Sequence, residues 1–121
     1  TWFMGEDEAD MKNEVYALQQ GIDAGLTLID TAEMYANGGA EVVTSQAIAG
    51  RRDKIFLVSK VLPYNASYNG TIEACEESLS RLNTDYLDMY LLHWRGNYRL
   101  SETFEAMEKL VKDGKIRSYG V

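Results

Sequence analysis

The sequence has few of the residues that crosslink proteins or bind metal ions. It contains one cysteine, Cys75, and one histidine, His93, among 121 residues. A single cysteine excludes an internal disulfide framework and is typical of a reducing compartment, so we expect a cytoplasmic location. For the same reason we do not expect a zinc cluster, which needs several cysteine or histidine ligands.

Long hydrophobic runs and an excess of basic residues are also missing. The apolar runs are only a handful of residues long, too short to span a membrane as a helix, and no segment has the pattern of a signal peptide. The formal net charge of −7 disfavours nucleic acids and anionic membranes as partners. Neither class of partner is therefore expected.

What the chain does contain is typical of one globular domain. Hydrophobic residues make up 45% and charged residues 26% of it, a balance that argues against disorder. A chain of 121 residues suits one domain with a real core. The sequence begins at Thr1 without an initiator methionine and stops at Val121 inside an apolar run. We therefore interpret residues 1–121 as part of a single longer domain, truncated at both ends.

Short apolar runs alternate with amphipathic stretches along the chain. Apolar residues spaced three and four apart predict helices at residues 10–23, 40–49, 71–82 and 101–112. Thr71 is the expected N-cap of the third helix. Continuous apolar runs predict five strands. The first would end at Trp2-Phe3-Met4, and the other four would span residues 26–29, 54–59, 86–92 and 116–121. Strands without polar alternation indicate a parallel sheet covered on both faces, and thus an α/β fold.

Two parallel architectures fit this order, an open doubly wound sheet and part of a (β/α)8 barrel. The loop after the first predicted strand lacks the G-x-G-x-x-G pattern of dinucleotide-binding sheets. A complete barrel needs about 250 residues, so the chain would be roughly half of one.

Polar residues follow three of the predicted strands. Asp30, Lys60 and His93 stand at three successive strand ends, spaced by about thirty residues, the length of one βα unit. Tyr35 lies in the loop after Asp30. Because barrel enzymes place catalytic groups at the carboxyl ends of their strands, the four side chains are expected to converge at one rim.

Each of these residues also has a purely structural explanation. Asp30 could cap a turn, Lys60 could be a solvated charge at a strand end, and His93 could be a satisfied structural histidine. Tyr35 is one of eight tyrosines. Their coincidence at one rim, in register with the repeat, favours a joint site over four separate explanations.

Several motifs, in order along the whole chain, resemble those of the aldo-keto reductase family. They are Thr1-Trp2, Asp30-Thr31-Ala32-Glu33-Met34-Tyr35, Val58-Ser59-Lys60-Val61, the segment 80–88, Leu91-Leu92-His93-Trp94 and the segment 114–121. Within the family the chain is most similar to bacterial reductases of methylglyoxal and other small aldehydes. The resemblance implies a (β/α)8 TIM barrel, of which this chain covers roughly the first half, strands 1 to 5.

The resemblance also implies an oxidoreductase that uses NADPH to reduce small aldehydes or ketones to alcohols by hydride transfer. Tyr35 would be the general acid that protonates the carbonyl oxygen, and Lys60 would ease this transfer by stabilising phenolate. Asp30 would pair with Lys60 and orient it. His93 would hydrogen-bond the carbonyl of the small-molecule substrate.

The resemblance also implies which residues contact the cofactor and which line the substrate pocket. Thr1, Trp2 and Asp30 match positions near the nicotinamide. The pocket positions are Trp2, Met34, Leu62 and Trp94. The family's Ser-Asn pair, stacking aromatic residue and phosphate clamp would lie beyond Val121, so most of the NADPH site is expected outside this chain.

Two other functions remain open at this point. Some members of the family are regulatory subunits that hold or sense the cofactor, and residues 1–121 could also form an inert half-barrel. The complete set of four rim residues favours the enzyme, although the isolated chain is expected to be inactive.

Overall fold

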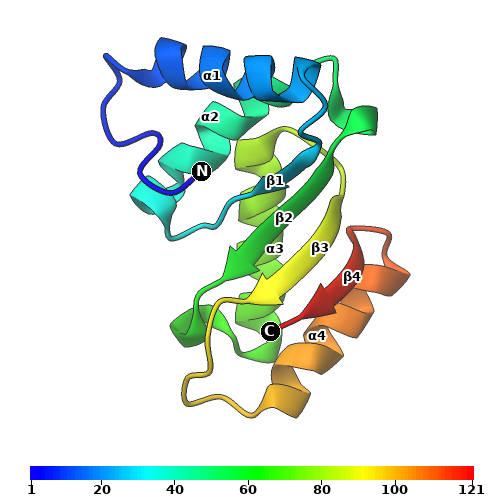
Figure 1. The fold of residues 1–121 in the computed structure, drawn as a ribbon. Helices are drawn as coiled ribbons and strands as arrows, with labels where there is room; N and C mark the ends of the chain where they lie inside the picture. The colour runs from blue at the N-terminus through cyan, green and yellow to red at the C-terminus, as the bar shows by residue number, and fades with distance from the viewer.

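The structure, a computed structural model of residues 1–121, alternates four parallel strands with four α-helices (Figure 1). The strands are β1 (Leu28–Asp30), β2 (Phe56–Val61), β3 (Leu87–Leu92) and β4 (Ile116–Gly120). The helices are α1 (Met11–Asp23), α2 (Gly39–Ile48), α3 (Tyr68–Leu82) and α4 (Leu100–Lys112). Short 3₁₀ turns lie at η1 (Tyr35–Gly38), η2 (Arg52–Lys54) and η3 (Pro63–Asn65).

The strands form one parallel sheet in the order β1-β2-β3-β4. A helix connects each strand to the next, which confirms the predicted βαβ order. The helices cover one face of the sheet (Figure 1). On the other face Leu28 and Phe56, paired across β1 and β2, are 63% and 41% exposed. The apolar core therefore lies between the sheet and the helices.

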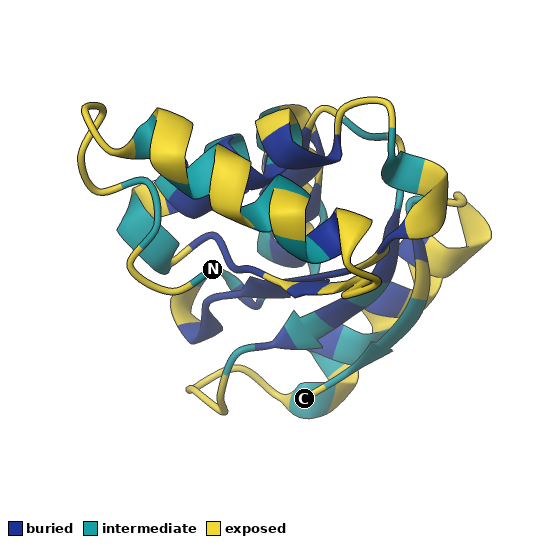
Figure 2. Cartoon of the chain, turned by 45° about the horizontal axis from the view of Figure 1, so that its top comes forward, coloured by how far each residue is buried: buried dark blue, intermediate teal, exposed yellow.

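Apolar positions one helical turn apart explain why the helices form where they do. On α4 the buried residues Thr103, Ala106, Met107 and Leu110 follow this spacing and face the core. By contrast α1 buries only Ile22, so its outer side is exposed, as Figure 2 shows. None of the helices is long and apolar enough to cross a membrane.

One predicted strand is wrong. Residues 2–4 lie in consecutive turns, and the Met4 amide donates to the Thr1 carbonyl at 3.1 Å. Phe3 has a φ of 66°, in the left-handed region that an extended strand does not use. The chain therefore contributes four strands to its sheet rather than five.

The start of α3 also differs from the prediction. The helix begins at Tyr68, and its N-cap is Ser67, whose hydroxyl accepts from the Gly70 amide at 3.0 Å. Thr71 lies inside the first turn, where its hydroxyl donates to the Ser67 carbonyl at 2.7 Å. Asn83, with a φ of 50°, ends the helix in a left-handed conformation.

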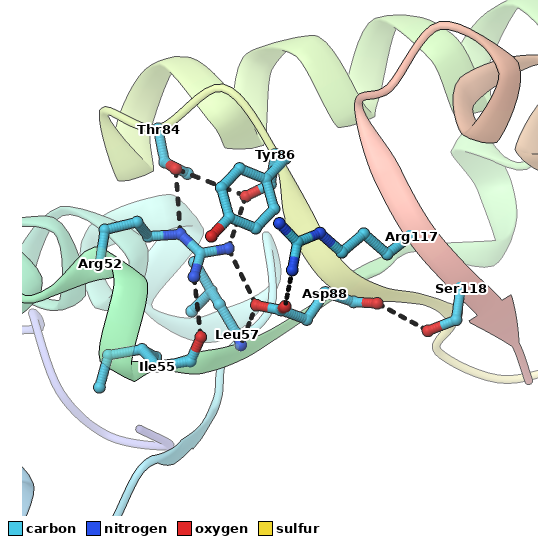
Figure 3. Close-up of polar contacts among 8 residues, drawn as sticks. All are labelled: Arg52, Ile55, Leu57, Thr84, Tyr86, Asp88, Arg117 and Ser118. Atoms are coloured by element: carbon cyan, nitrogen blue, oxygen red, sulfur yellow. Dashed lines mark hydrogen bonds and ion pairs between the residues drawn. The ribbon is translucent and has the colours of Figure 1, made fainter.

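A polar network joins three strands at their amino ends (Figure 3). The buried Asp88 carboxylate accepts from the Leu57 amide and from Arg52, each at 2.9 Å, and from Arg117 at 3.4 Å. The guanidinium groups of Arg52 and Arg117 lie 3.9 and 4.2 Å from the ring centroid of Tyr86. Because Asp88 is buried, losing its partners would leave an uncompensated charge, so this network stabilises the end of the sheet away from the candidate site.

Candidate active site

The sheet brings Asp30, Lys60 and His93 to the carboxyl ends of neighbouring strands. Asp30 is the last residue of β1, Lys60 is the second-last of β2, and His93 follows β3. The His93 amide donates to the Val61 carbonyl at 2.9 Å, which continues the pairing of β2 and β3 beyond the last residue of β3. These side chains therefore share one rim of the sheet with Tyr35, which begins η1.

Lys60 is at the centre of this group. Its ammonium lies 2.8 Å from the carboxylate of Asp30, and it donates to the Thr31 carbonyl at 2.9 Å and to the Tyr35 phenol oxygen at 3.3 Å. An ammonium has three donors, and these three partners use all of them. The Lys60 side chain is 11% exposed and that of Asp30 is 48% exposed. The charge of Lys60 is thus held in one place beside the phenol.

His93 packs edge-on against Tyr35, with ring centroids 5.7 Å apart and an interplanar angle of 83°. Partial burial, followed by the positive charge of Lys60, lowers the pKa of His93 from 6.5, and the negative charge of Asp30 opposes this only in part. The imidazole is therefore neutral near pH 7. Its Nδ1 atom is buried and has no hydrogen-bond partner within the chain.

A small hollow of about 170 Å³ opens at Tyr35 and His93. The other residues that line it are Trp2, Met34 and Trp94. The ring of Trp2 lies 6.3 Å from that of Tyr35 at an angle of 20°, and Trp94 packs against His93 at 4.9 Å. Its walls are thus mostly apolar, while a phenol and a neutral imidazole supply polar groups that can donate to a ligand's oxygen.

The remaining site residues named from the sequence divide into two groups. The Thr1 hydroxyl donates to the Asp30 carbonyl at 3.0 Å, so Thr1 lies at the same rim. Leu62 does not line the hollow at Tyr35. It is 8% exposed and borders a separate hollow of about 210 Å³ with Glu33 and Asn65.

A sequence model of the aldo/keto reductase family matches residues 1–121. The chain belongs to the aldo/keto reductase family. It is 63% identical over 121 residues to methylglyoxal reductase YeaE of Escherichia coli K12, covering the whole chain and 43% of that protein. To the glyoxal reductase of Bacillus subtilis it is 39% identical over 122 residues, covering 99% of the chain and 44% of that protein.

Solved aldo/keto reductases share this fold. The chain superposes with a TM-score of 0.98 and 64% identity on the Klebsiella pneumoniae enzyme in complex with NADP and acetate, covering 100% of this chain and 43% of the other. For the thermostable reductase Tm1743 the TM-score is 0.97 and the identity 40%, with 100% and 46% covered. The chain thus spans less than half the length of these relatives and has the fold of the N-terminal half of a (β/α)8 barrel.

Two buried acids of this chain were not expected to matter from the sequence. Glu41, at 0% exposure in the first turn of α2, accepts from the Ser59 hydroxyl and from Arg81, each at 2.6 Å. Glu33 accepts a hydrogen bond from the Leu62 amide, in the loop after β2. The sequence holds only a weak signal for either, because a buried glutamate looks like a surface one until the partners that surround it are known.

The turn after Tyr35 is a third unexpected feature. Ala36, Asn37 and Gly38 have φ values of 51°, 50° and 89°, three left-handed residues in succession. Such conformations are unfavourable for Ala36 and tolerated by Asn37, so the surrounding structure must hold the turn. A Cβ on Gly38 would lie 2.7 Å from the Arg81 side chain, which shows how closely α3 packs against it.

Proposed function

We propose that this chain is the N-terminal part of a single cytoplasmic barrel domain that reduces small aldehydes or ketones to alcohols with NADPH. The observation that carries the proposal is the Lys60 ammonium, which contacts both the Asp30 carboxylate and the Tyr35 phenol beside an apolar hollow. The names of the methylglyoxal and glyoxal reductases support small dicarbonyl compounds as the substrate class.

Each polar residue has one role in this reaction. Tyr35 donates its phenol proton to the carbonyl oxygen and later recovers a proton from solvent. Lys60 stabilises the phenolate that is left, and Asp30 holds Lys60 in place. His93, being neutral, orients the carbonyl by a hydrogen bond without adding a second positive charge. When bound, NADPH would supply the hydride to the carbonyl carbon and would leave as NADP⁺.

The residues present suit the nicotinamide end of the cofactor better than its phosphates. Thr1, Trp2 and Asp30 lie at the rim beside the hollow and are the residues that would face the nicotinamide. Lys60 has no donor left for a phosphate, because Asp30, Thr31 and Tyr35 use all three. We therefore place the phosphate-binding groups outside residues 1–121, in keeping with the net charge of −7.

The same hollow indicates which side chains would line the substrate pocket. Trp2, Met34 and Trp94 surround Tyr35 and His93, so a small carbonyl compound would be enclosed by apolar side chains with its oxygen toward the two donors. Leu62 would reach the substrate only if the loop after β2 moved, because it borders a different hollow here.

The test is NADPH consumption, followed by absorbance, in the full-length protein that carries this chain. With methylglyoxal we expect one NADPH to be consumed for each alcohol formed, over many turnovers, and no consumption without the aldehyde. Residues 1–121 alone serve as the control and should consume none. A full-length protein that binds NADPH but reduces none of a panel of small aldehydes would overturn the proposal and favour a cofactor-sensing subunit.

A further inference from the structure

Glu33 stands between Asp30 and Tyr35 in sequence but does not line the hollow of Tyr35. Its Oε1 atom accepts from the Leu62 amide at 2.7 Å and from the Asn65 side-chain amide at 3.0 Å. Glu33 is 9% exposed, so this carboxylate is largely removed from water. A hydrogen bond from a backbone N–H to a carboxylate is stronger than a neutral one, and losing it would leave the buried Leu62 amide unpaired.

This contact closes a loop of hydrogen bonds around Lys60. The Thr31 amide donates to the Val58 carbonyl at 2.9 Å, two residues before Lys60 in β2. The Glu33 carboxylate holds Leu62, two residues after Lys60. The segment that leads to Tyr35 is therefore attached to β2 before Lys60 and to the loop directly after β2.

The turn beyond Tyr35 has a backbone conformation that its surroundings must hold. Ala36 and Asn37 are left-handed residues other than glycine, which a loop adopts only when its surroundings hold it. Arg81 packs against the far end of this turn at Gly38. Glu33, two residues before Tyr35, is the carboxylate that holds the near end of the turn to the loop directly after β2.

We propose that Glu33 is a positioning residue: its carboxylate sets the separation between the Tyr35 loop and the loop directly after β2, and thereby maintains the contact between Tyr35 and Lys60. The proposal rests on the proposed function only for its kinetic consequence. The geometric claim, a contact of 3.3 Å that depends on Glu33, stands independently of the activity.

The kinetic test compares three variants in the full-length protein. Glu33→Ala removes the acceptor and should lower kcat by about tenfold to a hundredfold, the cost of a displaced catalytic group, with a much smaller change in KM for NADPH. Glu33→Gln keeps an oxygen at the same reach and should restore most of kcat. Glu33→Asp keeps the charge but shortens the side chain, so we expect the same effect as in Glu33→Ala. If Glu33→Ala does not fold, Glu33→Asp replaces it in the test.

The pH–rate profile separates positioning from a general loss of stability. The charged and titratable groups that face the Tyr35 phenol are Lys60, Asp30 and His93. If Tyr35 moves away from Lys60, its phenolate loses the nearby cation, so the high-pH limb of the kcat profile should shift to higher pH in Glu33→Ala. Glu102→Ala is the matched control, because Glu102 also accepts from a backbone amide, that of Tyr68 at 3.1 Å, and should leave the profile unchanged.

A crystal structure of Glu33→Ala or Glu33→Asp provides a readout that does not require activity. We expect the distance between the Tyr35 oxygen and Lys60 Nζ to lengthen beyond about 3.5 Å, the limit of a hydrogen bond. An unchanged distance, or a fall in melting temperature with kcat and pH profile intact, would overturn the role of Glu33. A wild-type protein without turnover would overturn the proposed function instead, and the distance would still decide the role of Glu33.

Discussion

The ammonium nitrogen of Lys60 lies 3.3 Å from the phenol oxygen of Tyr35 and 4.9 Å from the centroid of its ring. The lysine comes from β2 and the tyrosine from the turn that precedes α2. The separation of the two groups therefore depends on where β2 places Lys60 and on how the turn holds Tyr35.

Replacing Tyr35 with phenylalanine should remove the transferable proton and keep the ring. We expect kcat of the full-length protein to fall by about 10²–10⁴-fold, the usual contribution of general acid catalysis, with NADPH binding nearly unchanged. Steady-state NADPH consumption measures this. Tyr16→Phe, at an exposed position on α1, is the control and should keep full activity. Near-normal turnover in Tyr35→Phe would exclude Tyr35 as the acid.

Lys60→Met should lower kcat and also move the high-pH limb of the kcat profile to higher pH, because the phenolate loses its neighbouring cation. Asp30→Asn should have a weaker effect of the same kind through Lys60, and should also weaken nicotinamide binding. Lys54→Met, which removes an exposed lysine in η2, is the control. If the profile of Lys60→Met matches that of the wild type, Lys60 does not tune the phenol.

His93 should titrate below its ordinary pKa of 6.5, because partial burial and then the charge of Lys60 disfavour the imidazolium. NMR of the imidazole protons measures this, with His93→Gln to assign the signal. In Lys60→Met the pKa should rise back toward 6.5. A midpoint at or above 6.5 in the wild type would contradict the prediction.

The same shift fixes a direction for stability. Because the pKa of His93 is lower in the folded chain, the unfolded chain takes up a proton there at a higher pH, about 6.5. The free energy of unfolding should therefore decrease as the pH falls from about 6.5 through the lowered pKa of the folded chain. Above pH 6.5 the contribution is constant. Urea titrations at several pH values should show that His93→Gln removes this part of the pH dependence.

Cys75 should be unreactive in the folded protein. Burial in the core raises the pKa of its thiol to about 12, so almost no thiolate forms near neutral pH. A thiol-specific disulfide reagent should label residues 1–121 only after a denaturant is added. Rapid labelling without denaturant would show that the core around α3 opens readily.

The isolated chain should self-associate and bind NADPH negligibly. β1 and β4 are the outer strands of the sheet, and their unpaired backbone groups can pair with another chain. Leu28 and Phe56, on the face without helices, add exposed apolar area. Light scattering and NADPH fluorescence titration test both claims, with the full-length protein as the control. A stable monomer that binds NADPH tightly would contradict the prediction.

Local patterns in the sequence were enough to locate most elements. The predicted helix at residues 101–112 matches α4, at Leu100–Lys112, because its apolar positions repeat with the helical period. The strand predicted at Trp2-Phe3-Met4 is wrong, because a short apolar run does not reveal the left-handed backbone of Phe3. The prediction of Thr71 as N-cap is also wrong, because Ser67, four residues earlier, takes that role.

The sequence by itself determined the order of the elements from α1 to β4 and the rim to which Asp30, Lys60 and His93 belong. Both follow from periodicity along the chain and from the rule that parallel strands end at one edge. Only the tertiary structure decided that Leu62 borders a different hollow from Tyr35 and that Glu33 holds the loop after β2 to the Tyr35 loop. The physical reason is that such contacts join residues about thirty positions apart, which meet only after the strands have paired and side-chain packing has excluded water.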